Sequence, residues 1–202
     1  MPQAKTALRR VVERIARDLE DLDQRWALVG GLAVGARAEP RFTRDVDLAV
    51  AADSDADAEQ LVHALQQRGY RLVTMFEHEP TGHIGTVRFV SPAAPGILVD
   101  LLFAASGVEA EVVAAASLAT VMTDFRLPVA QRTHLLAMKL VAAHPDRRPQ
   151  DFIDIATLLE DATKADLAAV SRLLRLVKKR GFASGANLEL KWKQSLARFS
   201  DR

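Results

Sequence analysis

Residues 26–50 read WALVGGLAVGARAEPRFTRDVDLAV, and this stretch decides the fold. The apolar run Trp26–Val29 is typical of a short buried strand, and the pair Gly30–Gly31 interrupts it. The small residues that follow favour a helix, after which a second apolar strand carries Asp45 and Asp47. The stretch therefore predicts a strand, a glycine turn, a helix and a second strand with two acids.

The two acids and the glycine pair have properties that suit one common site. Asp45 and Asp47 stand two residues apart, so on a strand both side chains point to the same face. Two carboxylates aimed into one space repel each other unless a cation or a proton lies between them, and such oxygen ligands suit Mg²⁺ bound together with substrate phosphates. At Gly30 and Gly31 no side chain blocks phosphate oxygens from the backbone N–H groups of the next helix, whose dipole favours anions. The pattern predicts a combined metal and phosphate site.

Gly30–Gly31, the segment Arg41-Phe42-Thr43-Arg44 and the motif Asp45-Val46-Asp47 together resemble the signature of a known superfamily. It is the nucleotidyltransferase superfamily with the DNA polymerase beta-like fold, and the resemblance is strongest to the AbiEii-type nucleotidyltransferase toxins. The resemblance implies an α+β fold, with a mixed sheet flanked by helices and followed by a helical part. It also implies an NTP substrate and Mg²⁺ or Mn²⁺ as the cofactor.

A third acid, Asp100, lies within the apolar strand predicted at 97–103. A single carboxylate among apolar residues is costly to bury unless another group pairs with it. The superfamily places its third metal carboxylate on a strand next to the one that carries the two acids. The resemblance therefore assigns Asp45, Asp47 and Asp100 as catalytic and metal-binding residues. A carboxylate at a solvated strand edge is the structural alternative for Asp100.

The resemblance also assigns a set of residues to the nucleotide. Lys139 lies among apolar residues of a predicted helix, where its ammonium group needs an edge or an anion. The following segment Arg148-Pro149-Gln150-Asp151 is similar to a motif of the toxin family, and Asp154 falls on the same helix face as Asp151. A purely structural ion pair is the alternative reading for this acidic cluster. The residues expected to bind the nucleotide are Gly30, Gly31, Arg41, Thr43, Lys139, Arg148 and Asp151.

The remaining sequence predicts elements on both sides of this stretch. We expect helices at 4–22, 54–67, 109–117, 131–143, 149–159, 166–179 and 187–199, strands at 70–75, 86–90 and 97–103, a hairpin at 120–129, and a polar turn at 77–85. We interpret His78 and His83 in that turn as ordinary loop residues, with a metal pair as the alternative. We interpret Trp192 as a core-packing residue, with base stacking as the alternative. We divide the chain into a catalytic core, residues 1–130, and a helical region, residues 131–202, that completes the active site and contacts the acceptor.

Composition narrows the possible locations and partners. The chain has no cysteine, which excludes disulfides and thiolate metal sites, and no apolar stretch long enough to span a membrane, so we expect a cytoplasmic protein. The net charge of +1 conceals an asymmetry, because residues 172–202 carry +7 and the preceding residues −6. A basic tail attracts polyanions such as RNA, although a solvated helix face explains it equally well.

The preferred function is transfer of an NMP from an NTP to an RNA, at a tRNA 3′ end, or to a protein hydroxyl. Pyrophosphate is released, and the protein acts as the toxin of a toxin–antitoxin pair with a cognate antitoxin. One alternative is a nucleotidyltransferase that modifies small molecules such as aminoglycosides or lincosamides, because these enzymes share the glycine pair and the paired acids. A second alternative is a non-catalytic nucleotide-binding or antitoxin-like module.

Overall fold

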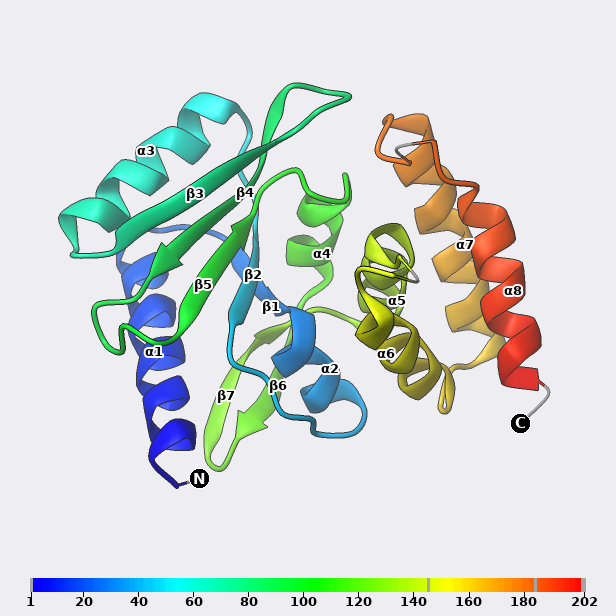
Figure 1. The fold of residues 1–202 in the computed structure, drawn as a ribbon, viewed down its shortest axis with the longest axis horizontal. Coiled ribbons are helices and arrows are strands. Elements are labelled where there is room, and N and C mark those ends of the chain that lie inside the picture. Colours follow the sequence, from blue (N-terminus) through cyan, green and yellow to red (C-terminus); the bar gives the residue numbers. More distant parts are fainter. Residues whose placement is uncertain (1, 145, 184, 201–202) are drawn as a thin grey trace.

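The computed structural model describes residues 2–144, 146–183 and 185–200, and within them seven strands form one mixed sheet (Figure 1). The strands are β1 (Trp26–Val29), β2 (Val46–Val50), β3 (Arg71–His78), β4 (His83–Val90), β5 (Leu98–Leu102), β6 (Ser117–Met122) and β7 (Phe125–Val129). Their order across the sheet is β3-β4-β5-β2-β1-β7-β6. β2 is parallel to β5 and β1 is parallel to β7, whereas the other neighbours are antiparallel.

Helices cover both faces of this sheet. In the described residues they are α1 (Pro2–Asp21), α2 (Gly30–Arg37), α3 (Asp55–Gln67), α4 (Glu109–Ala115), α5 (Arg132–Ala142), α6 (Pro149–Leu159), α7 (Lys164–Lys179) and α8 (Leu188–Ser200). Figure 1 shows α1 and α3 on one side, and α5 to α8 gathered on the other side beyond α2 and α4. The expected α+β fold is confirmed. The division into residues 1–130 and 131–202 stays a prediction, although all helices from α5 onward lie in the second part.

The central stretch forms the elements that its sequence predicts. β1 ends at Val29, α2 begins at Gly30, and β2 follows directly after Asp45. On β2 the side chains of Val46, Leu48 and Val50 are fully buried, whereas Asp47 between them is partly exposed. Because side chains alternate along a strand, one face of β2 packs in the core and the other presents its acids.

The β3–β4 hairpin is longer than the sequence indicates. Strand pairing continues to His78 and His83, so the polar turn predicted at 77–85 is wrong in its bounds. The register shifts opposite Phe76 and Glu77, because Gly85 on β4 has no partner on β3. Such a bulge bends the strand and re-aims the residues beyond it, which is why the hairpin tip turns toward the helices.

Local signals set several helix ends. Ser54 caps α3 by accepting a hydrogen bond from the Asp57 amide at 3.2 Å, and Thr163 and Asp166 form a reciprocal capping box on α7. Trp192 is 6% exposed and donates its indole N–H to Ser171, which confirms its packing role. None of the helices in the described residues combines the length and apolar character that a membrane span requires. Residues 201 and 202 of the basic tail, and residue 184 between the helices expected at 166–179 and 187–199, lie outside those residues.

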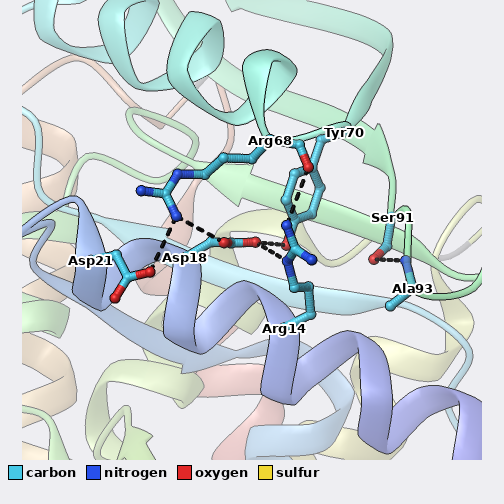
Figure 2. A network of polar contacts seen from close by, with 7 residues as sticks. All are labelled: Arg14, Asp18, Asp21, Arg68, Tyr70, Ser91 and Ala93. Carbon is cyan, nitrogen blue, oxygen red and sulfur yellow. Dashed lines mark hydrogen bonds and ion pairs between the residues drawn. The ribbon is translucent and has the colours of Figure 1, made fainter.

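A buried ionic network joins α1 to the segment between α3 and β3 (Figure 2). Asp18 is 3% exposed and accepts hydrogen bonds from Arg14 at 2.6 Å, Tyr70 at 2.9 Å and Arg68 at 3.0 Å. Burial alone would raise the pKa of Asp18, but these three donors outweigh burial and lower it. Arg68 also contacts the exposed Asp21. Every oxygen of Asp18 thus has a donor, and the network acts as a structural clamp.

Candidate active site

The glycine turn provides a close approach between backbone and carboxylate. Gly30 has a φ of 63°, in the left-handed region that favours glycine. A Cβ atom at Gly30 would collide with the Asp47 carboxylate, and one at Gly31 would lie 2.7 Å from the Arg41 guanidinium. Any larger residue at either position would displace a charged group of the site. The glycine pair therefore lets an acid and a cation converge on the N-terminus of α2.

Asp45 and Asp47 have no donor to neutralise them. Among the described residues, neither carboxylate has a hydrogen bond or ion pair with another side chain. Burial is the main cause that raises the pKa of both, and the negative charge of Asp100 adds to it. The pKa of Asp47 reaches about 6. A bound cation would remove this repulsion, so these two carboxylates are suited to hold one.

Asp100 lies beside them but has a protein partner. β2 and β5 pair so that Asp47 and Asp100 are direct neighbours across the two strands. On the other side β4 places Arg88 opposite Asp100, and its guanidinium makes two hydrogen bonds to the carboxylate, at 2.7 and 2.6 Å. Each carboxylate oxygen keeps a further lone pair for a cation or a proton. Asp100 is thus placed where the sequence predicts, with Arg88 as a partner that sequence reasoning missed.

Four charged side chains from distant segments form a second cluster at the cleft. Lys139 on α5 lies 2.7 Å from Asp151 and 2.8 Å from Asp154, both on α6. Arg41 contacts Asp154 from the other side at 2.8 Å. Asp154 would have a raised pKa from burial, but its bonds to Lys139, Gln150 and Arg41 lower it. The cluster holds Lys139 and Arg41 in fixed positions along the cleft.

Two buried atoms of this cluster have no hydrogen bond among the described residues. They are Oδ2 of Asp151, which is 5% exposed, and Nε of Arg41, although that Nε lies 2.8 Å from Asp154 Oδ1 in an ion pair. Nearby, the Lys191 ammonium donates to the Ala143 carbonyl at 2.8 Å and closes the C-terminal end of α5. Burial lowers the pKa of Lys191. The alternative reading, a local ion pair within the Arg148–Asp154 segment, is not what the structure has, because Asp151 and Asp154 pair with Lys139 on α5.

Arg148 and Thr43 complete the set expected to bind the nucleotide. The Arg148 guanidinium is exposed, and in the part of the chain that the structure describes it has no hydrogen bond or ion pair. Arg148 and Asp47 line the same cleft, and the positive charge of Arg148 lowers the pKa of Asp47. The Thr43 hydroxyl lies 3.5 Å from the Asp45 carbonyl. Arg148 is therefore the cation most available to an anionic ligand.

All of the predicted site residues line one cleft of about 830 Å³ between the sheet and helices α5 to α8. One end lies at the glycine turn after β1, where Arg41 lies against Gly31 and shares Asp154 with Lys139, and Arg148 stands directly before α6. The other end lies at β3, the edge strand of the sheet, and is lined by Phe76, Glu77 and His78 and by Phe182, which stacks on His78. The two histidines of the hairpin are opposite each other on β3 and β4, but their rings do not converge on a common metal site. The His78 ring stacks on Phe182, and the His83 ring contacts Asp55.

The donor set fits a divalent cation in part. Asp45 and Asp47 offer unpaired oxygens in one space, as Mg²⁺ or Mn²⁺ requires. Within residues 2–144, 146–183 and 185–200, no group of three His, Cys, Asp or Glu side chains is close enough to hold a metal ion. Asp100 lies next to this pair, but both of its carboxylate oxygens accept hydrogen bonds from Arg88. Asp45 and Asp47 fit the cation. Asp100 can contribute only if its oxygens are shared between Arg88 and the cation.

One known structure shares this fold, and two others resemble it more weakly. A nucleotidyltransferase-like antigen from Paracoccidioides brasiliensis superposes with a TM-score of 0.54 at 21% identity, covering 94% of this chain and 94% of that chain. The lincosamide antibiotic adenylyltransferase LnuA has a TM-score of 0.46 at 15% identity, covering 75% of this chain and 96% of that chain. The antibiotic-resistance factor ANT(2'')-Ia has a TM-score of 0.48 at 15% identity, covering 95% and 92%. No curated protein sequence matches the chain.

The fold and the cleft define the protein as a nucleotidyltransferase. The family described as nucleotidyl transferase AbiEii toxin of type IV toxin–antitoxin systems matches residues 13–201. The chain belongs to this AbiEii family.

Sequence reasoning missed two features of the cleft besides Lys191. Arg88 alternates with buried Val87 and Phe89, a pattern that indicates a side chain on the opposite, acid-bearing face. Its pairing with Asp100 depends on the strand order, which the sequence does not reveal. Phe76 and Phe182 carried no signal of their own, because the pairing of β3 with β4 and the turn after α7 bring them to the cleft.

Proposed function

We propose that this chain transfers an NMP from an NTP, with Mg²⁺ or Mn²⁺, to a hydroxyl at the 3′ end of a tRNA, and that it acts in the cytoplasm as the toxin of a toxin–antitoxin pair. The observation that carries the proposal is the unpaired, mutually repelling pair Asp45 and Asp47, set against the glycine turn at the N-terminus of α2. Membership of the AbiEii family supports the toxin role.

The glycine end of the cleft suits the triphosphate. The first N–H groups of α2 have no partner within the helix and favour anions. Arg148 is free to contact phosphate oxygens, whereas Lys139 and Arg41 are already positioned by Asp151 and Asp154. Thr43 borders the same space. A bound divalent cation would be held by Asp45 and Asp47 and would offset negative charge on the phosphates.

The transfer itself is an in-line substitution at the α-phosphorus. The acceptor oxygen forms a bond to this phosphorus, the bond to the bridging oxygen of the β-phosphate breaks, and pyrophosphate leaves. The acceptor proton needs a base on the side opposite the leaving group. Asp100 is the candidate, and its two bonds to Arg88 fix the direction of its remaining lone pairs.

The helical region after residue 130 supplies the other wall and a basic surface. Arg172, Arg175 and Lys179 are exposed on α7, at spacings of three and four residues that place them on one face. Such a stripe neutralises phosphates of a polynucleotide and makes binding depend on salt. This supports an RNA acceptor and the proposed role of residues 131–202 in contacting it.

The test is transfer of label from each of the four α-³²P NTPs, with Mg²⁺, to total RNA and to total protein. Asp47→Ala serves as the inactive variant, and an Asp53→Ala variant controls for loss of an acid outside the cleft. Label in tRNA with wild type but not with Asp47→Ala is the expected result. Label in protein alone shifts the acceptor to a protein hydroxyl. If neither RNA nor protein is labelled although the NTP binds, both kinds of acceptor are rejected and a small-molecule acceptor remains.

A further inference from the structure

An exposed aromatic side chain stands in the cleft beside the acids. Phe76 is 55% exposed and lines the cleft wall. Across the sheet it pairs with Thr86 on β4, which in turn pairs with Leu102 on β5. The next row on the same face holds Arg88 and Asp100. From strand spacing, the backbones of Phe76 and Asp100 lie about 12 Å apart, and both side chains stand on the same face of the sheet.

The segment that carries Phe76 is fixed by contacts at its tip. His78 stacks on Phe182 with ring centroids 4.1 Å apart and an angle of 18° between the rings. Phe182 occupies the space that a side chain at Gly107 would need. Arg180 donates to the Gly107 carbonyl and forms an ion pair with Glu111 at 2.6 Å. Figure 1 shows the tip of the hairpin directed at the turn between α7 and α8. Phe76 is therefore held in the cleft by the hairpin and is not on a loose loop.

The reaction geometry gives this end of the cleft to the acceptor. In an in-line substitution the attacking oxygen and the leaving pyrophosphate lie on opposite sides of the phosphorus. The leaving group belongs at the glycine turn and Arg148, so the attack comes from the side of Asp100. Phe76 lies beyond Asp100 on that side.

The chemistry of this end suits a neutral planar ring. Among the described residues that line this end, Glu77 is the single acid. Burial lowers the pKa of His78, so the imidazole ring next to Phe182 is uncharged at neutral pH. An acceptor rich in amines would need several acids here. Aromatic side chains stack on nucleobases without regard to sequence.

We propose that Phe76 is the stacking site for the base of the acceptor nucleotide, an inference that rests on the proposed transfer to RNA. The base would lie against the exposed ring of Phe76, with its sugar hydroxyl directed toward Asp100. Phe76 thereby selects a nucleotide acceptor and positions it without taking part in proton or phosphoryl transfer.

The test measures binding without transfer. The probe is a fluorescein-labelled single-stranded oligoribonucleotide that ends in a 2′,3′-dideoxynucleotide, with fluorescence anisotropy as the readout. Phe76→Ala is expected to weaken binding about tenfold, the loss of one stacked base. Phe76→Leu keeps an apolar side chain without a planar ring and gives a similar loss, whereas Phe76→Tyr retains affinity. Met75→Ala, on the same strand but outside the cleft lining, is the matched control and changes nothing.

A second probe lacks the terminal base. Wild type should bind this abasic oligonucleotide about tenfold more weakly, and Phe76→Ala should cause no further loss. NTP affinity, followed by thermal shift, should stay the same in all variants. Unchanged RNA binding by Phe76→Ala, or weaker NTP binding, overturns the inference and leaves the proposed function standing. Failure of wild type to bind RNA overturns both the RNA acceptor and this inference.

Discussion

Asp18 and Asp47 are carboxylates of one protein with opposite surroundings. Asp18, on α1, has three donors around it, and its pKa is lowered despite burial. Asp47, on β2, has no donor among the described residues and two acids nearby, and its pKa rises to about 6. The first arrangement stabilises the native state, and the second costs stability. A folded chain keeps such a cost where a ligand relieves it, so the difference separates a structural acid from a functional one.

Removal of the Asp18 carboxylate gives the largest expected loss of stability. Asp18→Ala leaves Arg14, Arg68 and the Tyr70 hydroxyl without their shared acceptor, and we expect about 3–5 kcal/mol of destabilisation in urea unfolding. Asp21→Ala is the control, because Asp21 is exposed and its side chain pairs only with Arg68 among the described residues; we expect a change within about 0.5 kcal/mol. Equal effects of the two variants would break the comparison.

The cations of the cleft also divide into a structural and a functional kind. Lys139→Met leaves the buried acids Asp151 and Asp154 without their main partner, so we expect a loss of about 2–3 kcal/mol in stability and weaker NTP binding. Arg148→Met removes a cation that has no partner in the described residues, so stability should not change while NTP affinity falls about tenfold. Urea unfolding and NTP titration measure both. A loss of stability in Arg148→Met would show that Arg148 has a structural role.

The acid side of the stability profile should reflect Asp18. Because its folded pKa is below the ordinary value of 3.8, its contribution is complete above that value and is lost as the pH falls through the folded pKa. The melting temperature of wild type should fall between about pH 5 and about pH 2.5, the range in which a paired acid takes up its proton. The melting temperature of Asp18→Asn should fall less over the same range. Identical profiles of the two proteins would contradict the role of Asp18.

Much of the fold could be predicted because its signals are local. The glycine pair, the small-residue helix and the alternation around Asp45 and Asp47 each depend on neighbours within a few residues, and the structure has them as expected. The placement of Asp100 next to Asp47 followed from family resemblance and from one acid in an apolar strand.

The missed features depend on contacts between distant segments. Arg41 and Asp154 are 113 residues apart in the chain, and only the packing of α6 against α2 brings them together. The Arg88–Asp100 pair depends on which strands are neighbours. The hairpin is longer than predicted because the polar residues at 77–85 are typical of a turn. In the structure, strand pairing continues to His78 on β3 and His83 on β4, and only the residues between them form the turn. The roles of the site residues in catalysis stay predictions.

The most direct test of the account is the unfolding free energy of Asp47→Asn, measured with its transfer activity. Because the folded pKa of Asp47 is about 6 against an ordinary 3.8, the native state holds an extra proton between these values, and wild type loses stability as the pH rises through them. At pH 7.5 without divalent cations, Asp47→Asn should be more stable than wild type by about 3 kcal/mol, a gain that vanishes below about pH 4. The variant should have no transfer activity and no stabilisation by Mg²⁺. A variant that is less stable than wild type, or that still transfers the nucleotide, would contradict the assignment of Asp47 as a functional acid.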